Sequence, residues 1–459
     1  MTEFFDPLAP EGLPEPVLSD RTPPRGSTAK LIAEAAAPLR VVHDPAFTSY
    51  FDRFGSARVV LLGASTHGTS EFYEARAAIT RRLVEQCGFN IVALEADWPD
   101  VRAVDRYVRH RGKSPNAQPV FQRFPAWMWR NAEFEGFMEW MRDHNRFRAA
   151  DRRVSVHGLD IYSLDAALRA VIEYLDQVDP EAAATARARY GRLAPWVEDP
   201  QADARQALTG GYARREPEVN ALLQELLEKR LHYEFLNEEA FLDATTNAKV
   251  LADAEAYFRA TFFGQAEAWN LRTQHMMETL GAILEARGAD SKAVVWAHNA
   301  LVGDARAAAM GREQGQISLG QLVREGFGDD ASALVGLGVG FGAVACASDW
   351  GAPMEIKPIY VPPPESYERL AWESGVRAFM LDLRPGWVDE ELRRRLSEPR
   401  PERFIGVIYR PETERLAHYA SCVLPDQYDA YVWFERSHPV RPLTTELRKG
   451  APETYPFGL

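Results

Sequence analysis

Cysteine is scarce in this sequence. Only three cysteines occur among 459 residues, and none lies in a CxxC pair or in another spacing typical of metal ligands. They are Cys87, Cys346 and Cys422. Isolated cysteines of this kind are typical of a reducing compartment and argue against a framework of disulfide bonds. We therefore expect a cytoplasmic protein.

The sequence also lacks a long hydrophobic run and an excess of positive charge. Its longest apolar stretch, residues 333–347, is too short and too rich in glycine to span a bilayer. The first twenty residues are acidic and proline-rich, unlike a signal peptide. The net charge of −13 disfavours binding to nucleic acid or to an anionic membrane. A small, neutral or cationic substrate fits this charge better.

Short β-branched runs alternate with long helical patterns along the chain. This alternation predicts an α/β fold with a mostly parallel sheet flanked by helices. Four runs are predicted to be buried strands: residues 58–63, 90–96, 153–160 and 293–299. Three further runs are candidate strands: residues 333–340, 378–383 and 404–410.

Composition divides the chain into an arm, a core and an insertion. Residues 1–26 are proline-rich and are predicted to form a flexible or surface-bound arm. Residues 165–290 are predicted to form a helical insertion over the carboxyl edge of the sheet. Its clearest apolar stripe consists of Leu222, Leu223, Leu226, Leu227 and Leu231. Residues 27–164 and 291–459 are predicted to form the α/β core domain.

Polar side chains gather where the four predicted strands end. In order along the chain they are His67, Glu95, Asp97, His157, Asp160, His298 and Asn299. Ligands of open α/β sheets bind at the carboxyl ends of the strands. Four polar strand ends in one chain therefore predict a functional site, and the alternative is a chance placement of helix caps.

His67 lies in a tight turn between a predicted strand and a predicted helix, within "VVLLGASTHGTSEFYEAR" (59–76). Thr69 or Ser70 can cap this helix, and two acidic residues, Glu71 and Glu74, are expected in its first turn. The positive end of the helix disfavours a protonated imidazole, so His67 is suited to act as a general base. The alternative is a turn histidine that only bonds the backbone.

Arg76 lies on the apolar stripe of the same predicted helix, together with Phe72 and Ile79. A charge on a core-facing stripe needs a carboxylate or a bound anion, because an unpaired buried charge is very costly. Glu95, at the end of the adjacent predicted strand, is the expected partner. The pair is either a structural strut or part of a catalytic site.

Seven segments together resemble the erythromycin esterase family, from about residue 30 to the C-terminus. They are "GASTHGTSEFYEARAAITRRL", "VALEADWPD", "FPAWMWRN", "GLDIYSL", "AEAWNLRTQHM", "VVWAHNALVGDAR" and "LPDQYDA". The resemblance implies an α/β core with a helical domain. It also implies hydrolysis of a macrolide lactone ester by a histidine that activates water, without a required metal or cofactor. The family's histidine matches His67, and its other motif positions match Glu95, Arg76 and His298.

Further side chains in these segments are candidates for contact with a small-molecule ester or lactone. They are Asp97, Trp98, Trp127, Arg130, Asn299 and His275. For Trp127 and Arg130, which lie in "FPAWMWRN", the alternative is a plain aromatic core at the start of a helix. Three positions depart from the family pattern, because Ala64 replaces an acid, Thr273 an aspartate and Leu301 a second histidine. Loss of an acid near the base typically lowers the rate by orders of magnitude.

These observations favour an ester hydrolase over two alternatives. In the hydrolase, His67 takes a proton from water and Glu95 orients His67 or shares the proton. Arg76 and His298 stabilise the oxyanion. The first alternative is a catalytically altered member that binds or modifies a small hydrophobic metabolite. The second is a metal-dependent hydrolase with His67, Glu95, His157 and His298 as ligands, although no HExxH spacing is present.

Overall fold

The structure is a computed structural model that describes residues 22–39, 42, 45–114, 120–188, 230–261 and 264–444. Most of the predicted N-terminal arm lies outside these residues. The leucine stripe of the predicted insertion lies outside the residues whose side chains are described. The division of the chain into an arm, a core and an insertion therefore stays a prediction.

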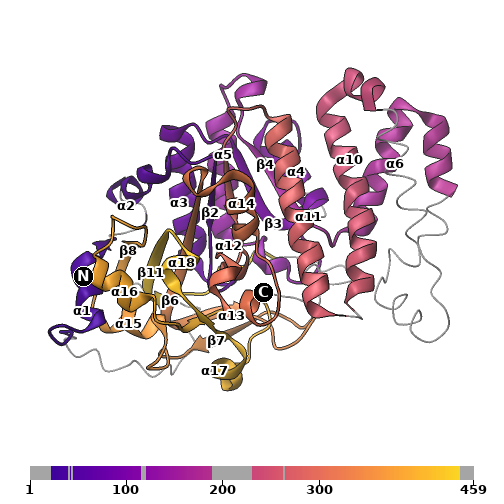
Figure 1. Cartoon of the computed structure of the whole chain (residues 1–459). Helices are drawn as coiled ribbons and strands as arrows, with labels where there is room; N and C mark the ends of the chain where they lie inside the picture. Colours follow the sequence, from indigo (N-terminus) through magenta and orange to yellow (C-terminus); the bar gives the residue numbers. More distant parts are fainter. Residues whose placement is uncertain are drawn as a thin grey trace, which may run out of the picture.

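A nine-stranded sheet forms the centre of the protein (Figure 1). Its strands are β1 (Ala37–Pro38), β2 (Val59–Leu62), β3 (Ile91–Asp97), β4 (Ser155–Asp160), β5 (Ala293–Trp296), β6 (Ser332–Cys346), β7 (Glu355–Ile359), β8 (Ala378–Asp382) and β11 (Ala430–Ser437). The order is β1-β8-β11-β6-β2-β5-β3-β4, and β7 pairs with β6. The pairings from β11 to β4 are all parallel, whereas β1, β7 and β8 pair antiparallel. The predicted α/β fold with a mostly parallel sheet is confirmed.

The four predicted buried strands are confirmed as β2, β3, β4 and β5, and every residue of these strands is buried. Two of the three candidate strands are confirmed within β6 and β8. The third prediction, residues 404–410, is wrong. The strand there is β9 (Arg400–Arg403), which pairs with β10 (Tyr419–Cys422) in a separate two-stranded sheet.

Residues 404–410 form only isolated bridges, because they pack beside the turn after β2 and the end of β6. Ile405 pairs with Thr66 and Ile408 with Ala347, each at a single position. The backbone N–H of Ile405 donates to the carbonyl of Ser65 at 2.8 Å. The alternating apolar residues of this segment are thus buried against the turn that carries His67, and not in a strand ladder.

The strands alternate between two buried cores, one on each face of the sheet. Val60 and Leu62 belong to the core that includes α3 (Ser70–Cys87) and α5 (Ala132–Asn145). Val59 and Leu61 belong to the other core, with residues of the helical segment after β4. Successive side chains of a strand point to opposite faces, so a strand that is apolar at every position has helices on both sides.

Most of the remaining helices lie on these two faces. They are α1 (Thr28–Ala35), α2 (Pro45–Ser49), α4 (Trp98–Val108), α6 (Leu164–Val178), α10 (Arg230–Ala260), α11 (Gln265–Ala286), α12 (Asn299–Val302), α13 (Ala309–Arg312), α14 (Leu319–Phe327), α15 (Tyr367–Glu373), α16 (Glu390–Leu396), α17 (Glu414–Ala417) and α18 (Leu424–Gln427). None of the helices in the described ranges has the length and apolar character needed to traverse a bilayer.

The segment between β4 and β5 is helical in its described parts. In Figure 1, α6 and α10 stand side by side beyond the β4 edge of the sheet, and α11 lies between them and the strands. Apolar residues of all three helices join the same core as Val59 and Leu61. Through α11, this segment also reaches the carboxyl ends of β3 and β4, as the contacts of Arg272 show below.

Candidate active site

The turn after β2 places His67 in the interior, with only 3 % of its surface exposed. The N–H of Ser65 donates to the carbonyl of Leu337 on β6 at 2.9 Å, which ties the turn to the sheet. Gly68 lies so close to β6 that a Cβ atom there would be 1.8 Å from the carbonyl oxygen of Ala345. Only glycine fits this approach, so the turn is held tightly against the strand.

The predicted side-chain cap of α3 is wrong. Thr69 is the N-cap residue, but its hydroxyl contacts those of Thr66 (2.5 Å) and Ser437 (3.0 Å) and makes no capping bond. Ser70 instead donates to Glu133 at 2.9 Å. The hydroxyls therefore tie the turn to β11 and α5, while His67 keeps its predicted position just before the helix.

His298 lies directly beside His67, with 4.9 Å between the ring centroids. It caps α12, because its Nδ1 accepts a hydrogen bond from the N–H of Ala300 at 3.3 Å. Its Nε2 donates to the carbonyl of Ile405 at 3.2 Å. Burial, and then the proximity of His67, lower the pKa of His298 to about 3. The His298 ring is thus neutral, and both of its nitrogens are occupied by the backbone.

Glu95 at the end of β3 joins this pair through the backbone. Its Oε2 accepts from the N–H of His298 at 2.7 Å. Its Oε1 accepts from Arg272 on α11 at 2.9 Å, and the same guanidinium makes two bonds to Asp160 at the end of β4, at 2.6 and 2.9 Å. The predicted ion pair between Glu95 and Arg76 is therefore wrong, because Arg272 takes that place.

Arg76 is buried without an ion pair to any described carboxylate within 4.0 Å. Its guanidinium lies over the rings of Tyr73 and Trp296, at 4.7 and 5.1 Å from their centroids. Its Nε has no hydrogen-bond partner among the described residues. Burial lowers its pKa, while Tyr73 and Glu95 oppose that shift. Stacking on aromatic rings thus holds a cation whose charge is not neutralised by a contacting carboxylate.

Tyr73 connects three of the predicted segments. Its hydroxyl lies 2.6 Å from the carbonyl oxygen of Met128 and 3.1 Å from that of His67. The predicted substrate residue Trp127 precedes Met128, and its buried Nε1 has no hydrogen-bond partner among the described residues. Tyr73 therefore contacts the backbone of the His67 turn and of Met128 through its hydroxyl, and the Arg76 guanidinium through its ring. Sequence reasoning did not select Tyr73, although it lies next to Phe72 on the same helix.

The other predicted substrate residues have structural contacts. Arg130 donates to the carbonyl of Val120 at 3.2 Å. Asp97 accepts from the N–H of Tyr162 and the hydroxyl of Ser163, at 2.7 and 2.6 Å. Burial raises the pKa of Asp97 to about 7, with Arg123 opposing.

Three predicted residues have side chains that bond to other parts of the protein. Trp98 donates to Asp243 on α10 at 2.7 Å and stacks on His157. The amide of Asn299 bonds the backbone of Leu337 in both directions. His275 lies between α10 and α11, with its Nδ1 2.6 Å from Asp253. These contacts account for their burial without a ligand.

The ligand set proposed for a metal is not assembled. His157 is stacked on Trp98 at 5.4 Å between ring centroids, and its pKa is lowered to about 4 by burial. Within the ranges that the structure describes, no three His, Cys, Asp or Glu side chains are grouped so that they could share a metal ion. The metal-dependent hypothesis therefore lacks its four ligands.

A sequence model described as erythromycin esterase matches residues 84–437, about three quarters of the chain. The chain belongs to the erythromycin esterase family. Family membership suggests a hydrolase. The match begins after His67 and Arg76, so these two assignments depend on the motif and on the geometry above.

Erythromycin esterase type II of Escherichia coli is 26 % identical over 107 residues, which cover 23 % of this chain and 24 % of that relative. The match thus spans about a quarter of the relative's length.

Solved structures of low sequence identity share the fold. A protein from Bacillus cereus has a TM-score of 0.76 at 19 % identity, covering 91 % of this chain and 98 % of its own. A succinoglycan biosynthesis protein has a TM-score of 0.73 at 20 % identity, covering 90 % and 97 %. A histidine-to-asparagine mutant of the erythromycin esterase EreC, in its open conformation, has a TM-score of 0.66 at 16 % identity, covering 88 % and 98 %.

The three departures from the family pattern do not face one common space. Ala64 is fully buried in the core with α3, and Leu301 is fully buried in the core on the opposite face. Thr273 on α11 donates to the carbonyl of Trp269, one turn earlier in its own helix. The three replacements therefore do not act together on one part of the site.

Arg272 is the main site residue that sequence reasoning missed. It is fully buried on α11, between Trp269 at i−3 and Met276 at i+4, which are buried too. This is the same signal that selected Arg76, namely an arginine on an apolar stripe. Applied to the segment "AEAWNLRTQHM", the signal could have identified Arg272 as well.

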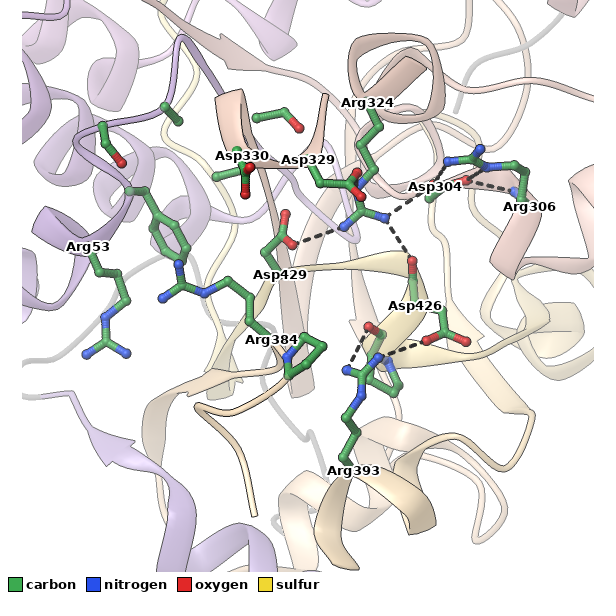
Figure 2. A pocket seen from close by; sticks show the side chains of 17 residues that line it. Arg53, Asp304, Arg306, Arg324, Asp329, Asp330, Arg384, Arg393, Asp426 and Asp429 are labelled. Atoms are coloured by element: carbon green, nitrogen blue, oxygen red, sulfur yellow. Dashed lines mark hydrogen bonds and ion pairs between the residues drawn. The ribbon is translucent and has the colours of Figure 1, made fainter. Parts of the chain in front are cut away.

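Two described cavities lie at the other end of the sheet. The larger, of about 600 Å³, is lined at the amino ends of β6 and β11 by charged residues (Figure 2). They are Arg53, Asp304, Arg306, Arg324, Asp329, Asp330, Arg384, Arg393, Asp426 and Asp429. A second cavity, of about 560 Å³, is bordered by Asn90 and Val154, just before β3 and β4. Neither cavity includes a predicted site residue.

Proposed function

We propose that this protein is a carboxylic ester hydrolase of the erythromycin esterase type, in which His67 activates water for attack on an ester or macrolide-type lactone. The observation that carries the proposal is Arg76, a buried guanidinium without a carboxylate partner beside the His67 turn. A buried charge of this kind is costly, and the negative charge that develops on the ester carbonyl oxygen during hydrolysis would offset the cost. The names of the relatives support an ester as the substrate class.

In the proposed reaction, His67 acts as the base and Arg76 stabilises the oxyanion. His67 takes a proton from water while the water oxygen bonds to the ester carbonyl carbon. The carbonyl oxygen then carries a negative charge, which Arg76 stabilises in a low-dielectric interior where charge–charge attraction is strong. When the tetrahedral intermediate collapses, the C–O bond to the alcohol breaks and the proton on His67 passes to the departing alkoxide oxygen. The products are a carboxylate and an alcohol.

The contacts of His298 and Glu95 assign them supporting roles in this proposal. The Nε2–H of His298 is directed to the carbonyl of Ile405, so we assign His298 to packing against the His67 ring and not to the oxyanion. Both oxygens of Glu95 are bonded, one to the N–H of His298 and one to Arg272. Glu95 therefore acts by fixing the position of the His298 backbone, rather than by sharing a proton with His67.

A second candidate function is binding of a small hydrophobic metabolite without turnover. The observation that favours it is Ala64, which leaves the His67 turn without the acid that the family pattern has there. The fully buried Ala64 side chain belongs to the apolar core that includes α3. The two functions differ in one measurable respect, because a binder is stabilised by the compound and forms no product.

The test is Arg76→Met, assayed with p-nitrophenyl butyrate and erythromycin. We expect kcat to fall by about 10²-fold or more, because removing one oxyanion donor typically has that effect. The melting temperature should stay unchanged or rise, since an apolar side chain replaces an unpaired buried ion. The matched control is Arg324→Met at the other end of the sheet, which should lower the melting temperature and leave kcat unchanged. Wild-type turnover in Arg76→Met would reject the proposed role of Arg76. Thermal stabilisation of the wild type by erythromycin, without hydrolysis of either compound, would favour the binder.

A further inference from the structure

We propose that Arg272 is a positioning residue for this site. From α11, Arg272 holds Glu95 at the end of β3. Glu95 then fixes the position of the His298 backbone and forms no ion pair with Arg76. The inference rests on the proposed hydrolase function. It assigns the helical segment after β4 a role in the chemistry, because α11 then supplies the cation that organises the carboxyl ends of two strands.

The contacts of Arg272 are specific in geometry. Nε and Nη2 bond the two oxygens of Asp160 at 2.9 and 2.6 Å, which is the side-on arrangement that a guanidinium favours with a carboxylate. Nη2 also bonds Oε1 of Glu95 at 2.9 Å. The rings of Tyr162 and Trp269 lie 5.6 and 5.9 Å from its central carbon. All three charged side chains are almost fully buried, so water does not weaken these attractions.

Glu95 links this cluster to the histidines. Its Oε1 is held by Arg272, and its Oε2 receives the N–H of His298 at 2.7 Å. The ring of His298 lies against that of His67. A displacement of Arg272 is thus transmitted to the base through one carboxylate, one backbone amide and one ring contact.

The same contact keeps Glu95 away from Arg76. Glu95 lies close enough to Arg76 to oppose the lowering of the arginine's pKa by burial. The two side chains nevertheless form no ion pair. Without Arg272, two buried carboxylates would remain beside each other with one cation nearby. Glu95 would then take up a proton or turn toward Arg76, and either change weakens the site. The cation that balances Glu95 and the cation assigned to the oxyanion are therefore different arginines.

Arg324 offers a matched comparison, because it too joins two aspartates from different segments. It bonds Asp304 at 3.2 Å and Asp429 at 3.1 Å, at the amino end of the sheet (Figure 2). If Arg272 were only a strut, its replacement would affect the protein as replacement of Arg324 does. Stability would fall and the chemistry would not change.

The experiment compares Arg272→Lys and Arg272→Met with Arg324→Lys and Arg324→Met, using p-nitrophenyl butyrate. We expect kcat to fall by about 10²-fold in Arg272→Met and about 10-fold in Arg272→Lys, with KM within about 3-fold, because small displacements of catalytic groups have effects of that size. Both Arg324 variants should retain kcat within about 2-fold. Asp160→Asn leaves the contact between Arg272 and Glu95 in place and should retain kcat within about 5-fold.

A second readout does not need turnover. In protein labelled with ¹³C at histidine Cε1, the His67 and His298 resonances, assigned through His67→Gln and His298→Gln, should shift in Arg272→Lys and stay unchanged in Arg324→Lys. If wild-type protein hydrolyses no ester, the proposed function fails while this measurement still tests the positioning role. Unchanged resonances in folded Arg272→Lys would overturn the inference. So would a loss of kcat in Asp160→Asn as large as in Arg272→Met, because the whole charge cluster would then matter rather than the bond to Glu95.

Discussion

At the carboxyl end of the sheet Arg272 joins Glu95 and Asp160, and at the amino end Arg324 joins Asp304 and Asp429. The two arrangements have the same chemistry in different surroundings. The side chain of Arg272 is 0 % exposed, whereas that of Arg324 is 12 % exposed and borders an open cavity. Water can solvate the second set of charges and reaches the first far less.

The difference in solvation determines what each arrangement contributes. Transfer of charges into a dry interior costs several kcal/mol per ion, which their mutual attraction offsets only when the geometry is good. Arg76, at the carboxyl end, has no contacting carboxylate among the described residues to offset this cost. Buried, incompletely compensated charges are typical of functional sites, whereas the charges around Arg324 are compensated by carboxylates and are expected to contribute to stability only. This difference supports the proposal that the functional site lies at the carboxyl end of the sheet.

The comparison is tested most strongly by Glu95→Gln against Asp429→Asn. We expect Glu95→Gln to lower kcat by about 10²-fold, because the His298 turn loses its anchor. Its free energy of unfolding should fall by about 3 kcal/mol, since a buried ion pair loses one partner. Asp429→Asn should retain kcat within about 2-fold. Ester hydrolysis and urea unfolding measure both effects, and equal kcat values in the two variants would remove the distinction between the ends.

Gly68→Ala should have the next largest effect. A Cβ atom at Gly68 would collide with the backbone of Ala345, so the turn that carries His67 has to move. We expect a loss of about 2–3 kcal/mol in unfolding free energy, as for overpacked cores, together with reduced turnover. The control is Gly88→Ala, where the left-handed backbone (φ 75°) costs about 1 kcal/mol and no atom lies within 4 Å. Equal melting temperatures for the two variants would show that the turn has room.

His157→Phe should reduce the sensitivity of the fold to acid. Burial lowers the pKa of His157 to about 4, with Asp105 opposing and Arg102 adding to the shift. The unfolded chain therefore binds a proton near pH 6.5 that the folded chain refuses until about pH 4. This stabilising contribution is complete above pH 6.5 and is lost as the pH falls toward 4.

Because each pKa unit corresponds to about 1.4 kcal/mol, wild type should lose roughly 3 kcal/mol more than His157→Phe between pH 7 and pH 4. Phenylalanine keeps the stacking on Trp98. His144, half-buried at the amino-end cavity, also has a pKa lowered by burial, and His144→Phe should produce a smaller change. Urea unfolding at several pH values makes the comparison, and parallel curves for wild type and His157→Phe would contradict it.

The smallest effect is expected for Arg306→Gln. This side chain is 55 % exposed, and its bonds to Asp304 compete with water. Exposed ion pairs contribute about 1 kcal/mol or less, so unfolding free energy should change by no more than that and kcat should not change. A loss above about 2 kcal/mol would mean that the amino-end cluster is as sensitive as the buried one.

Local pattern was sufficient to predict most of the fold and to select candidate site residues. The apolar runs identified β2 to β5, and the polar residues after them identified His67, Glu95 and His298. The alternating residues 404–410 misled, because a segment buried against a turn shows the same alternation as a strand. The contacts of Trp98, Asn299 and His275 were also beyond local pattern, since each is set by a different helix or strand.

The sequence by itself determined that His67 lies in the turn after a strand, that Arg76 lies on a buried stripe, and that a buried charge there requires an explanation. Only the tertiary structure decided which cation meets Glu95. Arg272 lies 177 residues further along the chain, yet it reaches Glu95 at 2.9 Å, while Arg76 lies over aromatic rings instead. Periodicity specifies which face of a helix is buried, but a hydrogen bond depends on distances of about 3 Å between distant segments. Those distances are set by the packing of α11 against the sheet.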